Sequence, residues 1–227
     1  MGALGRFISH VRQGRFDLIG KAISERVPWW LFHKGKAFIY VLNRPTSPDA
    51  STPPLPAPYH CRAATREEMP ACSRITGLDV TEYHRRFEAG DVCYGVFANN
   101  RPVNINWVHS GSCYIRGMGY SLVSAAVDKY IYGIMTDPAE RGKGLYKRCL
   151  VNLAHHFFAA GAERLIQMVE DGNTPVLNTL PQLGYVKTQE IRHVTVLGIK
   201  RTRATDLTTH VDSVRWFIKL PKDRFVI

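Results

Sequence analysis

The residues best suited to chemistry in this sequence lie between Arg141 and Lys147. Gly142 and Gly144 have no Cβ, so the main chain around them can approach a bulky anion closely. Arg141, Lys143 and Lys147 add positive charge to the same short stretch. At the start of a helix, unpaired backbone N–H groups and the helix dipole favour the same kind of ligand. The pattern predicts a cradle for a diphosphate, although a glycine pair is also typical of an ordinary strand–loop–helix connection.

The flanking segments are the elements that must position this loop. Residues 130–136 are β-branched and aromatic and predict a strand, which Asp137 and Pro138 end because proline cannot donate to a sheet. Gly133 inside that strand predicts a bulge. After Gly144 the apolar residues recur at helical spacing and predict a helix: Leu145, Cys149, Leu150, Leu153, Ala154 and Phe157.

A second strand–helix unit follows the first. Residues 164–169 predict a strand, Asn173 comes four residues later, and Gly184-Tyr185 closes the unit. Between them, one helical face is apolar: Val176, Leu177, Leu180 and Leu183.

The two units together resemble the GNAT superfamily of N-acetyltransferases, over roughly residues 57–200. The family signature Arg/Gln-x-x-Gly-x-Gly/Ala follows the fourth core strand and is matched by residues 141–146. A later Val-x-x-x-Asn, followed at a set distance by Gly-Phe, is matched by residues 169–173 and by Gly184-Tyr185. The resemblance implies an α+β fold, a three-layer α/β sandwich with a mixed, mostly antiparallel central sheet flanked by helices. An N-terminal helical or hairpin extension would precede it.

The resemblance also implies acetyl-CoA or another acyl-CoA as co-substrate. In such a site one strand of main chain pairs with pantetheine, the glycine loop holds the pyrophosphate, and Asn173 borders the thioester. The expected cofactor-binding residues are Ile134, Met135, Thr136, Arg141, Gly142, Lys143, Gly144, Leu145, Tyr146, Lys147 and Asn173.

Three positions depart from the family pattern. Tyr146 occupies the third glycine position, so its phenol must point away from the phosphates or stack beside them. Leu180, before Pro181, stands near where the family often has a tyrosine that protonates the thiolate. Tyr130 occupies the position of a glutamate base in the histone-modifying branch.

A general base must reach the acceptor amine directly or through one water. The candidate catalytic residues are His109, Asp128, Tyr130, Tyr132 and Glu170, with Asp171 as a less favoured base. An imidazole such as His109 ordinarily titrates near neutrality, but a histidine at a strand end is as often structural. Glu170 could instead pair with a cation, and Tyr130 or Tyr132 could donate to the leaving thiolate. Trp107 and Tyr114 could line an acceptor pocket, although aromatic residues on strands more often belong to a core.

The composition limits the class of protein. A hydrophobic content of 45% with 22% charged residues is typical of a globular domain, and no apolar run approaches the ~20 residues of a membrane span. The five cysteines have no C-x-x-C pair, which argues against a zinc site or disulfide framework, so no metal is expected and a reducing cytoplasm is favoured. Cys149 is a less favoured nucleophile, because its place on an apolar helix face already explains it.

The chain divides by composition into three parts. Residues 1–44 form a basic N-terminal extension, residues 45–58 a proline-rich linker, and residues 59–227 the acyl-CoA N-acyltransferase (GNAT) domain. We expect the extension to hold two short helices and a hairpin of residues 29–32 with 37–42. In the domain we expect helices from Thr65 and over residues 80–88, a polar loop over residues 201–209, and an edge strand over 214–220.

The net charge of +11 predicts attraction to anions without choosing among them. The basic extension could contact an anionic membrane or pack on the core with its cations in water. No recognised nucleic-acid motif is present, so no nucleic-acid partner is expected. A homodimer is one assembly to consider.

The leading hypothesis is an acyl-CoA-dependent N-acyltransferase, most simply acetyl, that acts by direct transfer on a primary amine of a small molecule or amino sugar. The alternatives are a non-catalytic CoA-binding or regulatory module, and an acyltransferase with a membrane-associated or protein acceptor.

Overall fold

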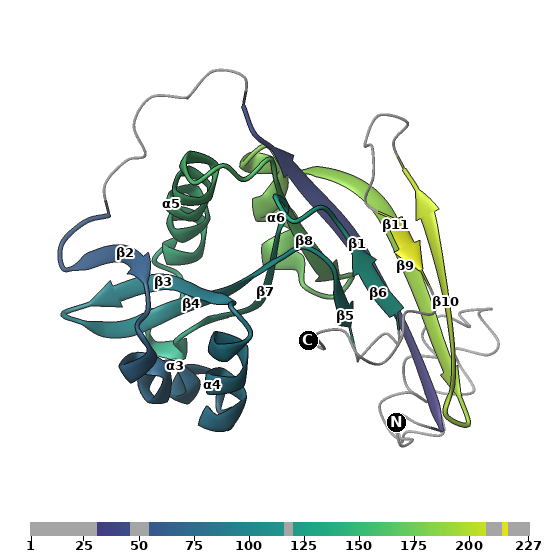
Figure 1. The fold of residues 1–227 in the computed structure, drawn as a ribbon, viewed down its shortest axis with the longest axis horizontal. Coiled ribbons are helices and arrows are strands. Elements are labelled where there is room, and N and C mark those ends of the chain that lie inside the picture. Colours follow the sequence, from purple (N-terminus) through teal and green to yellow (C-terminus); the bar gives the residue numbers. More distant parts are fainter. Residues whose placement is uncertain (1–30, 46–54, 116–119, 208–214, 218–227) are drawn as a thin grey trace, which may run out of the picture.

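The computed structural model describes residues 31–45, 55–115, 120–207 and 215–217 of the 227-residue chain. The strands of its larger sheet are β1 (Phe32–Asn43), β2 (Tyr59–Ala63), β3 (Val92–Ala98), β4 (Arg101–Ser110), β7 (Lys129–Thr136), β8 (Arg164–Glu170), β9 (Val186–Val196) and β10 (Ile199–Asp206). Their order is β10-β9-β1-β8-β7-β4-β3-β2. A smaller sheet contains β5 (Cys113–Ile115), β6 (Tyr120–Val123) and β11 (Arg215–Phe217), in the order β11-β6-β5 (Figure 1).

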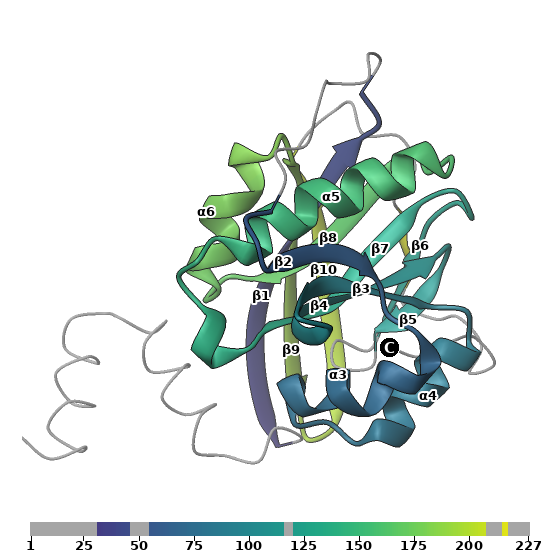
Figure 2. The same cartoon turned by 90° about the vertical axis from the view of Figure 1, so that its left-hand side faces the viewer.

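Helices cover both faces of the larger sheet. The short turn η1 (Arg66–Glu68) leads into α3 (Met69–Thr76), and α4 (Val80–Glu88) follows. On the other face lie α5 (Leu145–Ala159), preceded by η2 (Pro138–Glu140), and α6 (Thr174–Gln182). Figures 1 and 2 both show α5 on the opposite side of β3 and β4 from α3 and α4. Each face therefore has its own apolar core, one built on α3 and α4 and the other on α5 and α6.

The feature of the sheet most relevant to function is the place where β7 meets β8. These two strands pair in parallel only over Lys129–Ile131 and Leu165–Gln167, whereas the other strand pairs are antiparallel. Beyond that point β7 stays paired with β4 as far as Thr136, and β8 stays paired with β1 as far as Glu170. The sheet is thus split between β7 and β8 at their carboxyl ends.

Most of the predicted elements are confirmed. The α+β class, the mixed and mostly antiparallel sheet and the flanking helices are as expected. The helix over 80–88 and the strand over 59–63 have the predicted bounds. The helix expected from Thr65 begins as η1, whose first turn is closed by the Thr65 backbone N–H donating to the Glu68 carboxylate at 2.8 Å.

The prediction that residues 1–44 lie outside the core is wrong for residues 32–43. These residues form β1, which lies inside the larger sheet between β8 and β9. The hairpin expected around residues 33–36 is also wrong, because these residues continue the strand and pair with residues 192–195 of β9. Gly35 is not a turn residue: a Cβ there would meet the His193 ring at 2.2 Å, so it marks a close approach between strands.

The polar loop expected over residues 201–209 is wrong as well, since β10 runs to Asp206. This strand forms the edge of the larger sheet, where polar and charged residues are normal and blunt further pairing. The expected edge strand near the C-terminus is present as β11, at the edge of the smaller sheet.

The two helices predicted before residue 27, Trp29 and Trp30 of the hairpin, and most of the linker lie outside the described residues. Of the helices that the structure does describe, none is long and apolar enough to cross a bilayer.

Candidate active site

The loop between β7 and α5 presents a run of unpaired backbone donors. In the described part of the chain, none of the N–H groups from Gly142 to Lys147 donates to a backbone carbonyl. Gly142 and Gly144 adopt φ of +79° and +70°, a conformation that favours glycine, and a Cβ at either position would point into open space. The glycines therefore shape the loop and leave its donors accessible, as an anion-binding loop requires.

The gap between β7 and β8 begins at a β-bulge. Between the pairs Trp107–Tyr132 and Ile105–Met135 the register shifts, so β7 has one residue more than β4. Gly133, with φ of +56°, lies in this stretch, which confirms the predicted bulge. From Tyr132 onward no described residue pairs with β7 on the β8 side, so this edge of its backbone is open to an extended ligand.

The three predicted cations surround the loop but differ in what they contact. Lys143 Nζ lies 2.7 Å from a Glu140 carboxylate oxygen, and this contact raises the pKa of Lys143 and lowers that of Glu140. The Lys147 ammonium donates to Gln182, and the Arg141 Nε donates to the carbonyl of Thr136. All three side chains remain on the exposed side of the loop, close to the free N–H groups.

The sequence left two orientations open for the Tyr146 phenol: away from the phosphates or stacked beside them. Its phenol points away from the loop into the core on the α5 side and donates to Gln167 Oε1 at 3.1 Å. Burial raises the pKa of Tyr146. Gln167 is fully buried at the residue where β7 and β8 stop pairing, and its Nε2 has no partner among the described residues. A buried donor thus lies at the apex of the gap.

Asn173 lies at the carboxyl end of β8 as the residue before α6. Its carbonyl accepts from the N–H groups of Val176 and Leu177, so it begins that helix. Asn173 and the glycine loop follow neighbouring strands and therefore sit at the same edge of the sheet.

Three candidate catalytic residues come together on the face covered by α3 and α4. His109 lies opposite Tyr130, and Trp107 lies opposite Tyr132. The rings of Tyr130 and Tyr132 stack with centroids 5.9 Å apart.

Sequence reasoning missed Asp91, which organises this cluster. One carboxylate oxygen lies 2.6 Å from His109 Nδ1, and the other accepts from the Tyr132 hydroxyl. His109 Nε2 lies 3.3 Å from the carbonyl of Ser112, so both ring nitrogens face acceptors. Burial, followed by the charge of Asp91, raises the pKa of Tyr132, which makes it a weaker acid toward a leaving thiolate. No periodic pattern marks Asp91, because it lies in the turn between α4 and β3.

The structure places the candidate base Asp128 in a buried ion pair. Its carboxylate is fully buried and accepts from Arg164 at 2.8 and 2.7 Å, and from the N–H of Ala125 at 2.9 Å. With these donors in place, Asp128 anchors the start of β7 to β8 and has no position to receive a proton from a substrate amine.

Glu170 remains the exposed carboxylate among the candidates. It ends β8 directly opposite Ala37, a residue of the core on the α3 and α4 side. Glu170 therefore lies on the same face of the sheet as Tyr130 and Tyr132. It is on β8, whereas the two tyrosines are on β7, across the gap. The nearby cation Lys36 pairs with Asp171 and Glu190.

The five cysteines are all unpaired, and Cys149 is fully buried in the core beneath α5. Burial raises the pKa of Cys149 well above its ordinary range, and raises that of Cys113 to about 12. A thiol held neutral in this way is not a nucleophile, so Cys149 belongs to the packing of α5.

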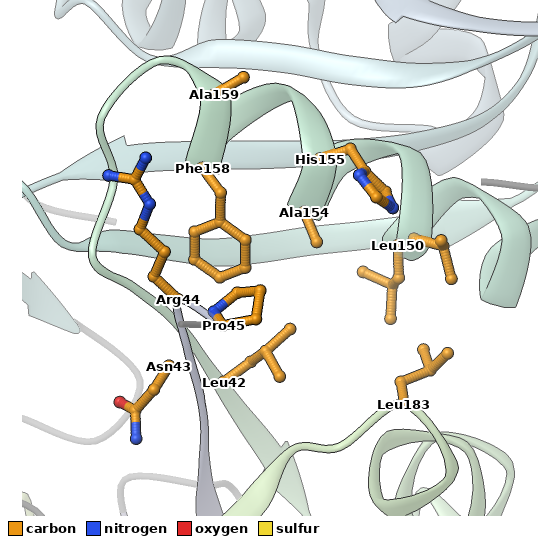
Figure 3. A pocket seen from close by; sticks show the side chains of 11 residues that line it. Leu42, Asn43, Arg44, Pro45, Leu150, Ala154, His155, Phe158, Ala159 and Leu183 are labelled. Carbon is orange, nitrogen blue, oxygen red and sulfur yellow. The ribbon is translucent and has the colours of Figure 1, made fainter. Parts of the chain in front are cut away.

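A separate hollow of about 640 Å³ lies along the C-terminal half of α5 (Figure 3). It is bordered by the end of β1 and by Leu183, and its lining is mainly apolar. None of the predicted site residues lines it, so it is distinct from the gap between β7 and β8.

The comparisons with known proteins agree with this architecture. Residues 111–185 match the model of the Acetyltransferase (GNAT) family, a range that covers β7, the glycine loop, α5, β8 and α6. No curated protein matches the chain as a sequence relative.

Three solved structures share the fold. A putative GNAT-family acetyltransferase from Novosphingobium aromaticivorans is 15% identical, with a TM-score of 0.50 over 72% of this chain and 64% of its own. A GNAT-family acetyltransferase from Colwellia psychrerythraea is also 15% identical, with a TM-score of 0.50 over 72% and 55%. A Drosophila protein is 14% identical, with a TM-score of 0.54 over 82% and 58%. This chain thus spans between 55% and 64% of the length of these three proteins.

Proposed function

Because this chain belongs to the GNAT superfamily, we propose that it is an acyl-CoA-dependent N-acyltransferase, with acetyl-CoA as its co-substrate and a small-molecule primary amine as its acceptor. The observation that carries the proposal is the gap that opens between β7 and β8 at their carboxyl ends. The loop that follows β7 presents its free backbone N–H groups at the same edge of the sheet. An extended chain can pair with the open edge of β7 while its diphosphate binds the loop. Few other ligands combine an amide-bearing arm with a diphosphate in this order.

The residues present fit such a molecule. Residues 142–147 supply the donors for the pyrophosphate, and Arg141, Lys143 and Lys147 supply charge that favours it. The backbone of Ile134, Met135 and Thr136 is the open strand edge for the pantetheine arm. The buried Nε2 of Gln167 provides a further donor at the apex of the gap. Acetyl-CoA, when bound, supplies the activated acyl thioester.

The side chains around the gap position and deprotonate the amine. Glu170 is exposed on one arm of the gap, on the face of the sheet where Tyr132 lies on the other arm. We assign it the role of accepting the ammonium proton, because His109 already faces two acceptors. The buried tyrosines and Trp107 form the floor of this face and exclude water from it.

The role of Glu170 is tested by Glu170→Gln, with Asp171→Asn as the matched control on the neighbouring residue. Loss of a general base should lower kcat by about 10²–10⁴-fold while CoA still binds. Asp171 pairs with Lys36 at 3.5 Å and should change kcat little when it is replaced. If Glu170→Gln retains full kcat, another group must take the proton.

The proposed function itself is tested by acetyl-CoA consumption in the presence of a library of small amines and amino sugars. Thiol release well above the rate without amine supports transfer, and the acetylated product identifies the acceptor. Tight CoA binding without turnover of any amine in the library would favour a non-catalytic CoA-binding module instead.

A further inference from the structure

Arg86 lies at the centre of the face that would receive the acceptor. Its side chain is only 11% exposed. The guanidinium carbon lies 5.7 Å from the ring centroid of Tyr83, 5.6 Å from that of Trp107 and 5.1 Å from that of Tyr132. Since these rings come from α4, β4 and β7, the cation is held where three elements meet.

The bulge of β7 lets the Arg86 guanidinium approach the backbone of Gly133 closely. A Cβ at Gly133 would lie 3.0 Å from Arg86 Nη1 and 3.1 Å from Trp107 Cδ1. A side chain at this residue would be tight against both groups, and the φ of +56° also favours glycine. Arg86 and the edge of the indole therefore converge directly above the bulge, at the start of the open edge of β7.

Arg86 shares the carboxylate of Glu82 with a second arginine. Its Nε donates to Glu82 at 2.9 Å, but Glu82 also accepts two bonds from Arg85, at 2.9 and 2.8 Å. One carboxylate thus serves two guanidinium groups. Among the described residues, no further acceptor bonds the terminal nitrogens of Arg86.

A second donor lies at the same place. Trp107 Nε1 is buried and faces the Tyr83 hydroxyl, without a hydrogen bond of ordinary geometry to any residue that the structure describes. The nearby Tyr83 hydroxyl is already bonded to Thr76 at 2.8 Å. A buried donor without an acceptor is costly, so a ligand that accepts from it gains affinity.

We infer that Arg86 and Trp107 form a subsite for a carboxylate, and that the acceptor is an amino acid or a close analogue in which the amine and the carboxylate are a few bonds apart. A planar guanidinium fork matches a carboxylate, and the indole N–H adds a second contact. The subsite borders the bulge, so an amine next to that carboxylate would face the gap that holds the thioester.

The same arrangement disfavours simple amines. An ammonium group without an attached anion would meet the positive charge of Arg86 and would offer no acceptor to the indole N–H of Trp107. Discrimination would therefore arise from repulsion of the wrong acceptor as well as from attraction of the right one.

This inference rests on the proposed function, so its test separates the two. L-amino acids and their L-amino acid amides, which differ only in the carboxylate, are compared as acceptors with acetyl-CoA and as ligands of the CoA-saturated protein. We expect kcat/KM or affinity to favour the acids by about tenfold or more. The failure of CoA to bind the native protein would defeat the proposed function, whereas CoA binding with no preference for acids would overturn only the carboxylate subsite.

Variants identify the residues responsible. Arg86→Lys should lose about tenfold or more in kcat/KM for the acids, mainly through KM, and leave the amides unchanged. Trp107→Phe removes the N–H donor together with part of the buried indole, so it should also raise KM for the acids. Arg85→Ala is the matched control, because it removes the neighbouring cation without touching the rings. Calorimetry with CoA should give the native affinity in all three, and equal acid-to-amide ratios in Arg86→Lys and Arg85→Ala would contradict the assignment.

Discussion

At the scale of single residues, the site depends on two glycines that shape the main chain. Gly142 and Gly144 hold left-handed φ values that cost other residues about 1–2 kcal/mol, and their missing side chains keep the loop open. The neighbouring cations are less decisive, since Lys143 is paired with Glu140. The backbone donors are the feature that distinguishes this loop from an ordinary turn.

Gly144→Ala and Gly161→Ala form a matched pair for this feature. Gly161 follows the other end of α5 and has φ of +92°, and a methyl group there would likewise point into open space. Both variants should lose roughly 1–2 kcal/mol in the free energy of unfolding, measured by urea denaturation. Only Gly144→Ala should also weaken CoA binding, because its methyl group points into the space that we propose for the diphosphate. Equal CoA affinities in the two variants would argue against the loop as the binding site.

At the scale of elements, α4 contributes to the stability of the fold and also positions Arg86 on the face of the sheet that we propose for the acceptor amine. The helix begins with Asp79, whose carboxylate accepts from the N–H of Thr81 at 2.8 Å, and it presents Glu82 to both Arg85 and Arg86. These arginines, with Arg85 as the larger contributor, lower the pKa of Glu82 from its ordinary 4.5 to about 2. The position of the Arg86 side chain is therefore coupled to the charge state of Glu82.

The pH dependence of stability follows from the direction of this shift in the pKa of Glu82. The folded state favours the ionised carboxylate, so the contribution of Glu82 is complete above pH 4.5 and is lost as the pH falls toward about 2. We expect the native protein to be more stable than Glu82→Gln above this window, and the difference to shrink within it. Urea midpoints across this range measure the effect. A difference that stays constant down to the acid end would contradict the coupling.

At the scale of the whole molecule, the sheet is completed by a strand that is distant in sequence. Residues 32–43 fill the place between β8 and β9, and so lie beside one arm of the gap. Three residues of β1 are fully or almost fully buried in the core on the α3 and α4 side: Ala37, Ile39 and Val41. Residues 32–43 are therefore part of the fold on which the site stands.

A chain that begins at residue 45 tests this arrangement. Removal of β1 would leave the facing edges of β8 and β9 without partners and expose apolar core, so we expect this chain to aggregate or to lose its cooperative thermal transition. A chain that begins at residue 31 keeps β1 whole and is the control for shortening as such. If the chain from residue 45 melted cooperatively at the native temperature, β1 would be an accessory strand.

The sequence predicted what is local and missed what depends on distant contacts. The loop from Arg141 to Lys147 and the bulge at Gly133 are visible because glycine, proline and period changes act over a few residues. The place of β1 could not be predicted, because its pairing with residues 164–170 leaves no trace in local periodicity. For the same reason Asp128 looked available until Arg164 was found bound to it, and Asp91 and Arg86 were recognised only once α4, β4 and β7 were placed together.

The most direct test of the proposed CoA site is a calorimetric titration of the native protein and of Gly144→Asp with CoA, with pantetheine as the comparison ligand. A carboxylate at residue 144 would repel the diphosphate, and pantetheine has no diphosphate to bind. We predict that the native protein binds CoA at least tenfold more tightly than pantetheine, about 1.4 kcal/mol, and that Gly144→Asp abolishes this advantage. Equal affinity of the native protein for the two ligands, or CoA binding that Gly144→Asp leaves unchanged, would contradict the assignment of the loop to the diphosphate.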